Sequence, residues 1–175
     1  MKTSRILVSA MLGLAAAGMA GAADTDAKPV GVRADVTFVQ PEKFADVRDA
    51  YAPSEMGRDG ILDQLRDYIV SRANYYVPEG QKLTISFTDI DLAGDFEPWR
   101  GPQGMDIRVV KDIYPPKMDF DFKLTDAGGK VLKEGKRQLR DLAFMSKLTL
   151  NTNDALHFEK ALLEYWFHNE FPRGN

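Results

Sequence analysis

Three short stretches of this chain alternate apolar with polar residues, and this period of two constrains the fold more than any other feature. Such alternation is typical of β-strands that bury one face. The stretches cover residues 32–38, 83–88 and 118–124, and the last of them precedes Gly128-Gly129. Consecutive glycines readily adopt the positive φ angles of a tight hairpin turn, so we expect a returning strand over 131–139.

Two longer segments have the residue spacing of helices. Between Met56 and Val77 apolar residues recur at every third or fourth position, and Pro78 follows. The second segment is expected to begin at a cap at Asn153-Asp154 and to end before Pro172. It is apolar around most of its circumference, which indicates a well-buried helix.

The order of these elements predicts the fold class. A strand, a helix and a strand in close succession favour a βα unit, and residues 107–113 are a weaker strand candidate. We predict an α+β fold of two layers, in which two helices lie on one face of a mostly antiparallel sheet of four to five strands. The expected order is β-α-β-(β)-β-β-α, and the other face of the sheet is left half exposed.

The N-terminal pattern and the charge predict where the protein acts. Residues 1–22 combine Lys2 and Arg5 with an apolar run too short for a transmembrane helix, which is typical of a cleaved signal peptide. Its removal takes the formal charge from −3 to −5, because both bases leave with it, so nucleic acid is not an expected partner. We predict a flexible lead-in over 23–33, a single domain over 34–173, no transmembrane segment and a periplasmic location. The chain has no cysteine, so a packed core must hold the domain together.

Common catalytic and cofactor motifs are missing from the sequence. The two histidines, His157 and His168, lie about 16 Å apart along one expected helix, too far to share a metal ion. No serine stands in a nucleophile elbow, and the sequence has no glycine-rich phosphate loop. We therefore predict no cofactor and assign no catalytic residue.

The loop over 89–102 concentrates acidic side chains and is the first site candidate. Its carboxylates could hold a calcium or magnesium ion, and the candidate ligands are Asp89, Asp91, Asp95 and Glu97. An EF-hand-type loop is not matched, because Ala93 and Arg100 stand where ligands are required. The alternative is that nearby bases neutralise these acids through charge-assisted hydrogen bonds, and those bases are Arg100, Arg108 and Lys111.

The position of this loop also constrains the strand before it. Asp89 and Asp91 continue the inward-facing positions of the strand over 83–88, where an unpaired buried charge is strongly unfavourable. The strand must therefore end or twist near Thr88. The loop then stands at the C-terminal end of the strand, a usual place for ligand sites in α/β sheets.

Trp99 and Arg100, flanked by Pro98 and Pro102, form the second site candidate. Tryptophan and arginine dominate binding hot spots, and flanking prolines reduce the entropy that a loop loses on binding. We accordingly predict a partner-binding surface made of Asp95, Glu97, Trp99, Arg100 and Arg108. The competing interpretation is that Trp99 folds back to cover the core, with Arg100 stacked on it.

The returning strand of the hairpin is rich in bases. A basic patch could bind phosphates or anionic lipid headgroups, whereas lysines on an edge strand also prevent edge-to-edge pairing. We favour the second interpretation, because Asp119 and Asp121 are expected across the hairpin from these bases. The bases are Lys130, Lys133, Lys136, Arg137 and Arg140, and Gly135 among them is a candidate bulge.

Residues 89–102, 109–116 and 134–142 resemble a family of secreted proteobacterial proteins known only as a domain of unknown function. The resemblance extends over about 34–173. It implies a periplasmic location and a single domain, and it brings no activity, cofactor or catalytic residue.

Two functions of different classes follow from these features. The leading hypothesis is a non-enzymatic periplasmic binding or accessory protein whose contact surface lies around residues 95–108 and whose partner is another envelope protein or a cell-envelope component. The rival is a metal-dependent hydrolase, or a calcium-stabilised domain, that uses the acidic loop over 89–97.

Overall fold

The structure is a computed structural model that describes residues 31–49, 54–101, 106–147 and 153–172. Contacts within the chain divide it into two units, Met1–Val30 and Gly31–Asn175, and the fold described below is that of the second. The predicted signal peptide and most of the predicted lead-in lie outside the described residues.

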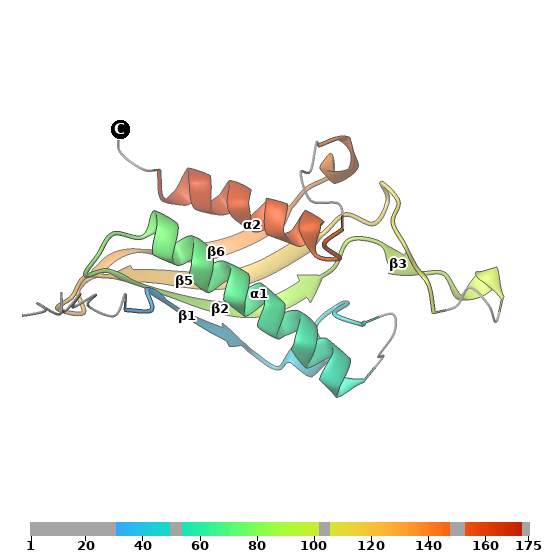
Figure 1. Ribbon diagram of the computed structural model, residues 1–175, viewed down its shortest axis with the longest axis horizontal. Helices are drawn as coiled ribbons and strands as arrows, with labels where there is room; N and C mark the ends of the chain where they lie inside the picture. The colour runs from blue at the N-terminus through green and yellow to red at the C-terminus, as the bar shows by residue number, and fades with distance from the viewer. Residues whose placement is uncertain (1–30, 50–53, 102–105, 148–152, 173–175) are drawn as a thin grey trace, which may run out of the picture. The chain divides into compact units, whose positions relative to one another are not determined.

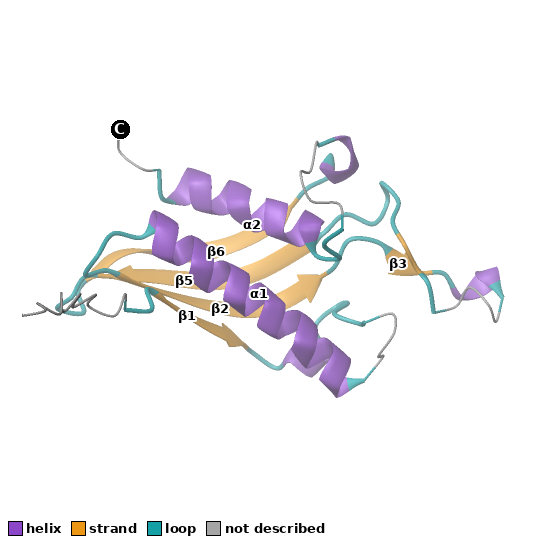
Figure 2. Ribbon diagram, in the orientation of Figure 1, coloured by secondary structure: helices purple, strands orange, loops and turns teal. Residues whose placement is uncertain are grey.

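The second unit is built on a mixed sheet of four strands (Figures 1 and 2). The strands are β1 (Ala34–Phe38), β2 (Lys82–Asp91), β5 (Lys117–Thr125) and β6 (Val131–Arg140), and they lie in the order β1-β2-β5-β6. β1 pairs with β2 in parallel, as the helix between them requires, and the other two pairings are antiparallel. A second sheet contains only β3 (Asp95–Phe96) and β4 (Arg108–Val109), so the weak strand candidate over 107–113 shrinks to two residues.

Two α-helices cover one face of the large sheet, and the predicted α+β fold is thereby confirmed (Figure 1). α1 (Glu55–Tyr76) starts at Ser54, whose side chain accepts a hydrogen bond from the Gly57 N–H. α2 (His157–Glu170) begins later than the expected cap at Asn153-Asp154. The Asp154 carboxylate accepts a hydrogen bond from the Leu156 N–H and closes a turn there, so the helix starts after it. Three short 3-10 helices also lie within the described ranges: η1 (Pro41–Lys43), η2 (Pro98–Arg100) and η3 (Phe144–Ser146).

Aromatic rings fill the space between the sheet and the helices. Phe120 lies edge-on to Trp166, with 4.8 Å between the ring centroids, and Phe122 meets the same indole at 5.6 Å. Trp166 is buried, so the expectation of a well-buried second helix is met on the face that carries this indole, whereas Tyr165 on the same helix is 63% exposed. Each of these rings removes a large apolar area from water and so stabilises a chain that has no disulfide.

A polar cluster joins the two helices. The carboxylate of Glu164 on α2 accepts hydrogen bonds from Tyr68, Arg72 and Tyr76 of α1, at distances of 2.6 to 3.0 Å. Partial burial alone would raise the pKa of the Glu164 carboxyl. The hydrogen bonds from these donors lower the pKa by more, so it lies below its usual value. The cluster therefore holds α1 and α2 together more strongly when Glu164 is ionised.

A shift in strand register keeps the acids of β2 out of the core. The pairing of β2 with β5 is regular up to Phe87 and resumes at Asp89, so Thr88 is left out of the register. Ile90 and Leu92 consequently turn inward and are buried, whereas Asp89 and Asp91 stay partly exposed. The expected change near Thr88 is thus a bulge, and the strand continues through it to Asp91.

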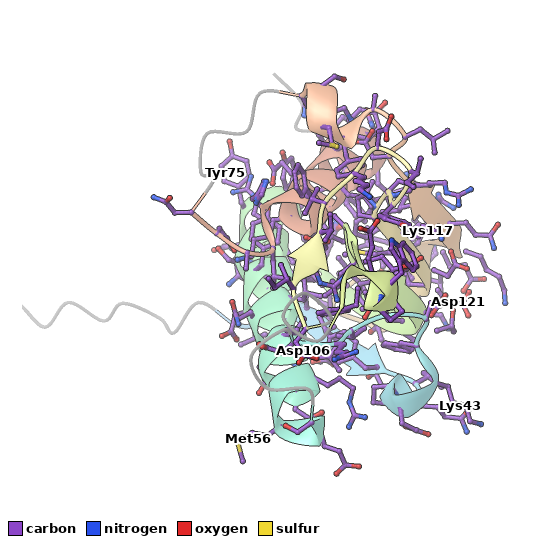
Figure 3. All side chains as sticks on the ribbon, turned by 90° about the vertical axis from the view of Figure 1, so that its right-hand side faces the viewer. Lys43, Met56, Tyr75, Asp106, Lys117 and Asp121 are labelled. Carbon is purple, nitrogen blue, oxygen red and sulfur yellow. The ribbon has the colours of Figure 1, made fainter. Side chains whose placement is uncertain are left out.

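The basic strand β6 pairs with acids on both of its faces. On the open face Lys136 lies 3.5 Å from Asp121, and on the helix-covered face Lys133 and Arg137 contact Glu170 of α2. Asp119 lies opposite Gln138, so of the two predicted acids only Asp121 faces a base across the hairpin. Figure 3 shows Lys117 and Asp121 on the opposite side of the unit from Tyr75 of α1.

The predicted bulge at Gly135 is wrong, because the register shift in this hairpin falls between Leu124 and Thr125. Gly135 has another role. A Cβ atom there would lie 2.8 Å from Nη1 of Arg137 and 3.4 Å from the ring of Phe122. The glycine leaves room for the guanidinium of Arg137 to stack on that ring, 4.8 Å from its centroid.

Candidate functional site

Residues 93–115 form an arm that leaves the end of β2, and residues 102–105 within it are not described (Figure 1). At its base the Gly94 N–H donates a hydrogen bond of 3.0 Å to the carbonyl of Tyr114. Gly94 has a φ of 84°, and a Cβ atom on it would lie 2.8 Å from the carbonyl oxygen of Val109. Only glycine fits there, because any side chain would meet both the φ penalty and the opposite backbone.

A buried carboxylate stiffens the middle of the arm. Glu97 is only 1% exposed, and it forms an ion pair with Lys111 and accepts a hydrogen bond from the Tyr114 hydroxyl. Loss of hydration and the nearby Glu97 carboxylate raise the pKa of that hydroxyl. A buried acid is stable only with such partners, so Glu97 fixes the arm and does not offer a surface for contact.

Two guanidinium groups hold the root of the arm to the rest of the unit. The ring of Phe96 lies between Arg48 and Arg108, with 4.3 Å and 4.6 Å from the guanidinium carbons to its centroid. Arg108 pairs with Asp46 at 2.8 Å and donates to the carbonyl of Arg48. The prediction that Arg108 neutralises the acids of the loop is therefore wrong, whereas the same prediction for Lys111 is confirmed at Glu97.

Large apolar side chains are exposed along the arm. Trp99 is 71% exposed, Ile113 66% and Ile107 57%, and Val110 is also exposed. The interpretation that Trp99 covers the core is wrong, because the indole in the core is that of Trp166. Exposed apolar surface gathered on one structural element is a common mark of an interaction site.

The four candidate metal ligands do not converge. Asp89 accepts a hydrogen bond from the Ala45 N–H, Asp91 pairs with Lys117, and Asp95 accepts from the Phe96 N–H. Glu97 is engaged with Lys111 inside the arm. Within the described ranges, no group of three or more His, Asp or Glu side chains is placed to hold a metal ion.

The predicted partner-binding residues separate into two groups. Asp95 and Trp99 offer exposed side chains, whereas Glu97 and most of Arg108 are withdrawn from water and position the arm. The backbone of Arg100 belongs to η2, and its side chain lies outside the described part of the structure. Ile107, Val110 and Ile113 join the exposed group. Ile107 falls within the contact surface predicted around residues 95–108, whereas sequence reasoning assigned Val110 and Ile113 only to a weak strand.

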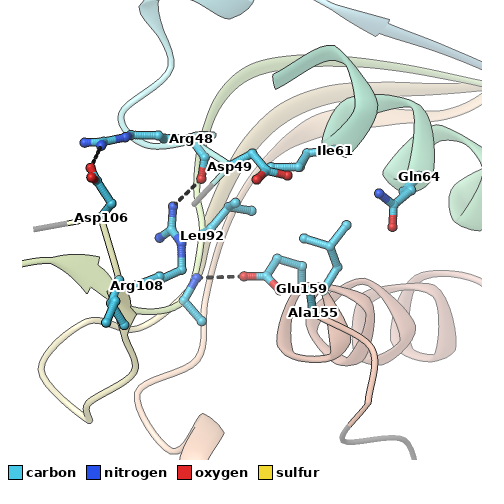
Figure 4. Close-up of a pocket in the computed structure, with 12 residues that line it drawn as sticks. Arg48, Asp49, Ile61, Gln64, Leu92, Asp106, Arg108, Ala155 and Glu159 are labelled. Carbon is cyan, nitrogen blue, oxygen red and sulfur yellow. Dashed lines mark hydrogen bonds and ion pairs between the residues drawn. The ribbon is translucent and has the colours of Figure 1, made fainter. Parts of the chain in front are cut away.

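A cavity of about 500 Å³ lies beside the root of the arm (Figure 4). Its apolar lining includes Ile61 of α1, Leu92 and Leu156, and its polar lining includes Arg48, Asp49, Asp106, Arg108 and Glu159. Figure 4 shows Arg48 and Asp106 on one side of the cavity and Glu159, from α2, on the other. Sequence reasoning did not identify this cavity.

Glu159 is the unusual group of this cavity. It is 1% exposed, one carboxyl oxygen accepts a hydrogen bond of 2.7 Å from the Ala93 N–H, and the other has no hydrogen-bond partner in the described structure. Burial raises the pKa of the Glu159 carboxyl above its usual value. Its place on the apolar stripe of α2, three residues before Leu162, was the sequence signal that could have identified it.

The fold and the site define a small α+β domain that presents a braced, apolar arm beside a cavity. The model of a family described as a protein of unknown function (DUF3016) matches residues 32–169, and the chain belongs to this family. Searches of curated proteins and of solved structures gave no match. Among the described residues, neither helix is long and apolar enough to cross a bilayer.

Proposed function

We propose that this protein is a non-enzymatic periplasmic binding or accessory protein, and that its contact surface is the exposed apolar side chains of the arm. The observation that carries the proposal is the 71% exposure of Trp99 on a segment whose base and middle are fixed. Covering such an indole with another molecule is favourable, because its large apolar surface then leaves water.

The construction of the arm supports this proposal. Tryptophan is enriched among the residues that dominate interface energies. The Glu97–Lys111 ion pair and the two-stranded ladder of β3 and β4 fix the backbone that leads to Trp99 before any partner arrives. Binding then orders few additional torsions, which leaves more of the contact energy available for affinity.

Charge indicates what kind of surface the arm contacts. Asp95, Asp106 and Asp112 are exposed on the arm. A polyanion would be repelled by these acids, so the partner is an envelope protein or another envelope component with an apolar, uncharged or basic contact surface. The periplasmic part of the proposal rests on the signal-peptide pattern of residues 1–22.

Crosslinking in intact cells tests the proposal with a matched pair of variants. Trp99→Ala removes the exposed indole, and Tyr165→Ala removes a 63% exposed aromatic side chain from α2, away from the arm. We expect Trp99→Ala to lose the crosslinked component and Tyr165→Ala to retain it. The melting temperatures of both variants should be close to that of the wild type. The proposal is rejected if both variants retain the component, or if Trp99→Ala unfolds the protein.

No observation favours the hydrolase or calcium alternative as a second function. Each of its four carboxylates has a partner within the protein, and the four lie on different parts of β2 and the arm. Melting of the native protein with and without a chelator tests that alternative, which requires a fall in melting temperature when the chelator is added.

A further inference from the structure

The cavity beside the arm has the features of a small-molecule site and is separate from the exposed face of Trp99. Its volume of about 500 Å³ lies within the range of known ligand pockets, and its walls are mostly apolar. It also contains one deeply buried polar group, the Glu159 carboxyl, with an oxygen that has no hydrogen-bond partner among the described residues. An apolar pocket with a single unsatisfied polar group selects a ligand that carries one complementary polar group.

The charges of the lining indicate the sign of that group. Three acids and two bases line the cavity: Asp49, Asp106, Glu159, Arg48 and Arg108. The two bases are already engaged, since Arg48 pairs with Asp106 at 2.9 Å and Arg108 with Asp46 at 2.8 Å. Among the described residues other than Glu159 itself, only the Ala93 N–H donates a hydrogen bond to this carboxylate, so a cation is the missing partner of its ionised form.

We propose that this cavity binds a small amphipathic amine. The hydrocarbon part of the ligand lies against Ile61, Leu92 and Leu156, and its ammonium group donates to the free oxygen of Glu159. The carboxyl turns toward the cavity about its terminal torsion, which is broad for glutamate. An anionic amphiphile is disfavoured, because its head would face Glu159 while both guanidiniums of the lining are occupied.

Calorimetric titration of the whole protein with three probes of similar apolar size tests this inference. The probes are n-hexylamine, 1-hexanol and hexanoate. We expect saturable binding of hexylamine, at least about tenfold weaker binding of hexanol, and no binding of hexanoate, since a buried charge pair contributes more than a neutral contact. Equal binding of hexylamine and hexanol, tighter binding of hexanoate, or no saturable binding of hexylamine would overturn the proposal.

Variants separate recognition by Glu159 from simple partition into an apolar space. Glu159→Gln keeps the side-chain shape and the acceptor for Ala93 but removes the charge, and we expect it to weaken hexylamine binding at least about tenfold. Glu134→Gln, at an exposed acid on β6, is its matched control and is expected to bind hexylamine as the wild type does. Unchanged binding by Glu159→Gln overturns the proposal.

A second variant keeps the test decisive if Glu159→Gln folds poorly. Ala155 is exposed and lines the cavity, so Ala155→Leu fills part of it without disturbing the core. We expect it to abolish hexylamine binding, while Ala127→Leu, at an exposed position in the β5–β6 turn, leaves the binding unchanged. Retained binding in Ala155→Leu overturns the proposal. Trp99 does not line the cavity, so these results leave the crosslinking test of the arm independent.

Discussion

Replacing Lys111 by methionine should loosen the arm without loosening the sheet. Methionine keeps most of the apolar length of lysine and removes the charge that faces Glu97, an acid that is 1% exposed. Removing one partner of a fully buried ion pair destabilises a protein by about 3 to 5 kcal/mol. The Lys111 side chain is 40% exposed, so water already weakens this pair, and we expect about 1 to 3 kcal/mol.

This loss should be local and measurable by amide hydrogen exchange. Each 1.4 kcal/mol corresponds to about a tenfold faster exchange through local opening, so the Gly94 N–H and the β3–β4 ladder should exchange about 10 to 100 times faster in Lys111→Met. The amides of β5 within the large sheet should be unaffected. Lys123→Met, which breaks an exposed contact of 3.7 Å with Glu134, is the matched control and should change neither region.

A second substitution distinguishes an unpaired charge from a lost contact. Glu97→Gln combined with Lys111→Met removes both charges, so the double variant should exchange more slowly at the base of the arm than Lys111→Met alone. Unchanged exchange of the Gly94 N–H in Lys111→Met, or equal acceleration throughout β5, would refute the inference that this ion pair braces the arm.

Three other changes test separate parts of the structure. Trp166→Ala should lower the free energy of unfolding in urea by about 3 to 5 kcal/mol and Trp99→Ala by about 1 kcal/mol, because only the first indole is buried; equal losses would contradict these positions. Gly94→Ala should lower the melting temperature more than Gly129→Ala does. Both glycines have a positive φ, but only a Cβ atom at Gly94 would clash with another part of the backbone. Equal falls in melting temperature would show that the backbone moves away from this Cβ atom at no cost in stability. Glu164 has a lowered pKa, because hydrogen bonds from α1 outweigh its partial burial. The stability that the ionised Glu164 contributes is fully present above the pKa of this carboxyl in the unfolded chain, and it is lost as the pH falls through the lower pKa of the folded protein. The Glu164→Gln variant should therefore lose less stability on acidification than the wild type.

Patterns local in sequence predicted the large sheet and both helices. The period of two in β1, β2 and β5 reports which face of each strand meets the core, and that property depends on neighbouring residues alone. The two acids of β2 even indicated a change near Thr88, since their charges cannot follow Phe87 into the core. The start of α2 was misjudged, because Asp154 caps a turn with the same chemistry that caps a helix.

Contacts between residues far apart in the sequence determine the geometry of the site, and no local sequence pattern predicts them. Arg108 follows the acidic loop closely in sequence, yet it pairs with Asp46, which precedes α1. Whether Trp99 is buried or exposed depends on the direction of the arm, which Gly94 and the Glu97–Lys111 pair determine. Residue type alone favoured a buried indole.

Fluorescence of Trp99 tests the central claim most directly. The chain has two tryptophans, so Trp166→Phe leaves Trp99 as the only indole, and circular dichroism verifies that the variant is folded. We predict emission typical of an indole in water and strong quenching by acrylamide, followed by a blue shift and protection from quenching when a periplasmic or envelope fraction is added. Emission typical of a buried indole in the isolated protein, or an unchanged spectrum with every envelope fraction, would contradict the account.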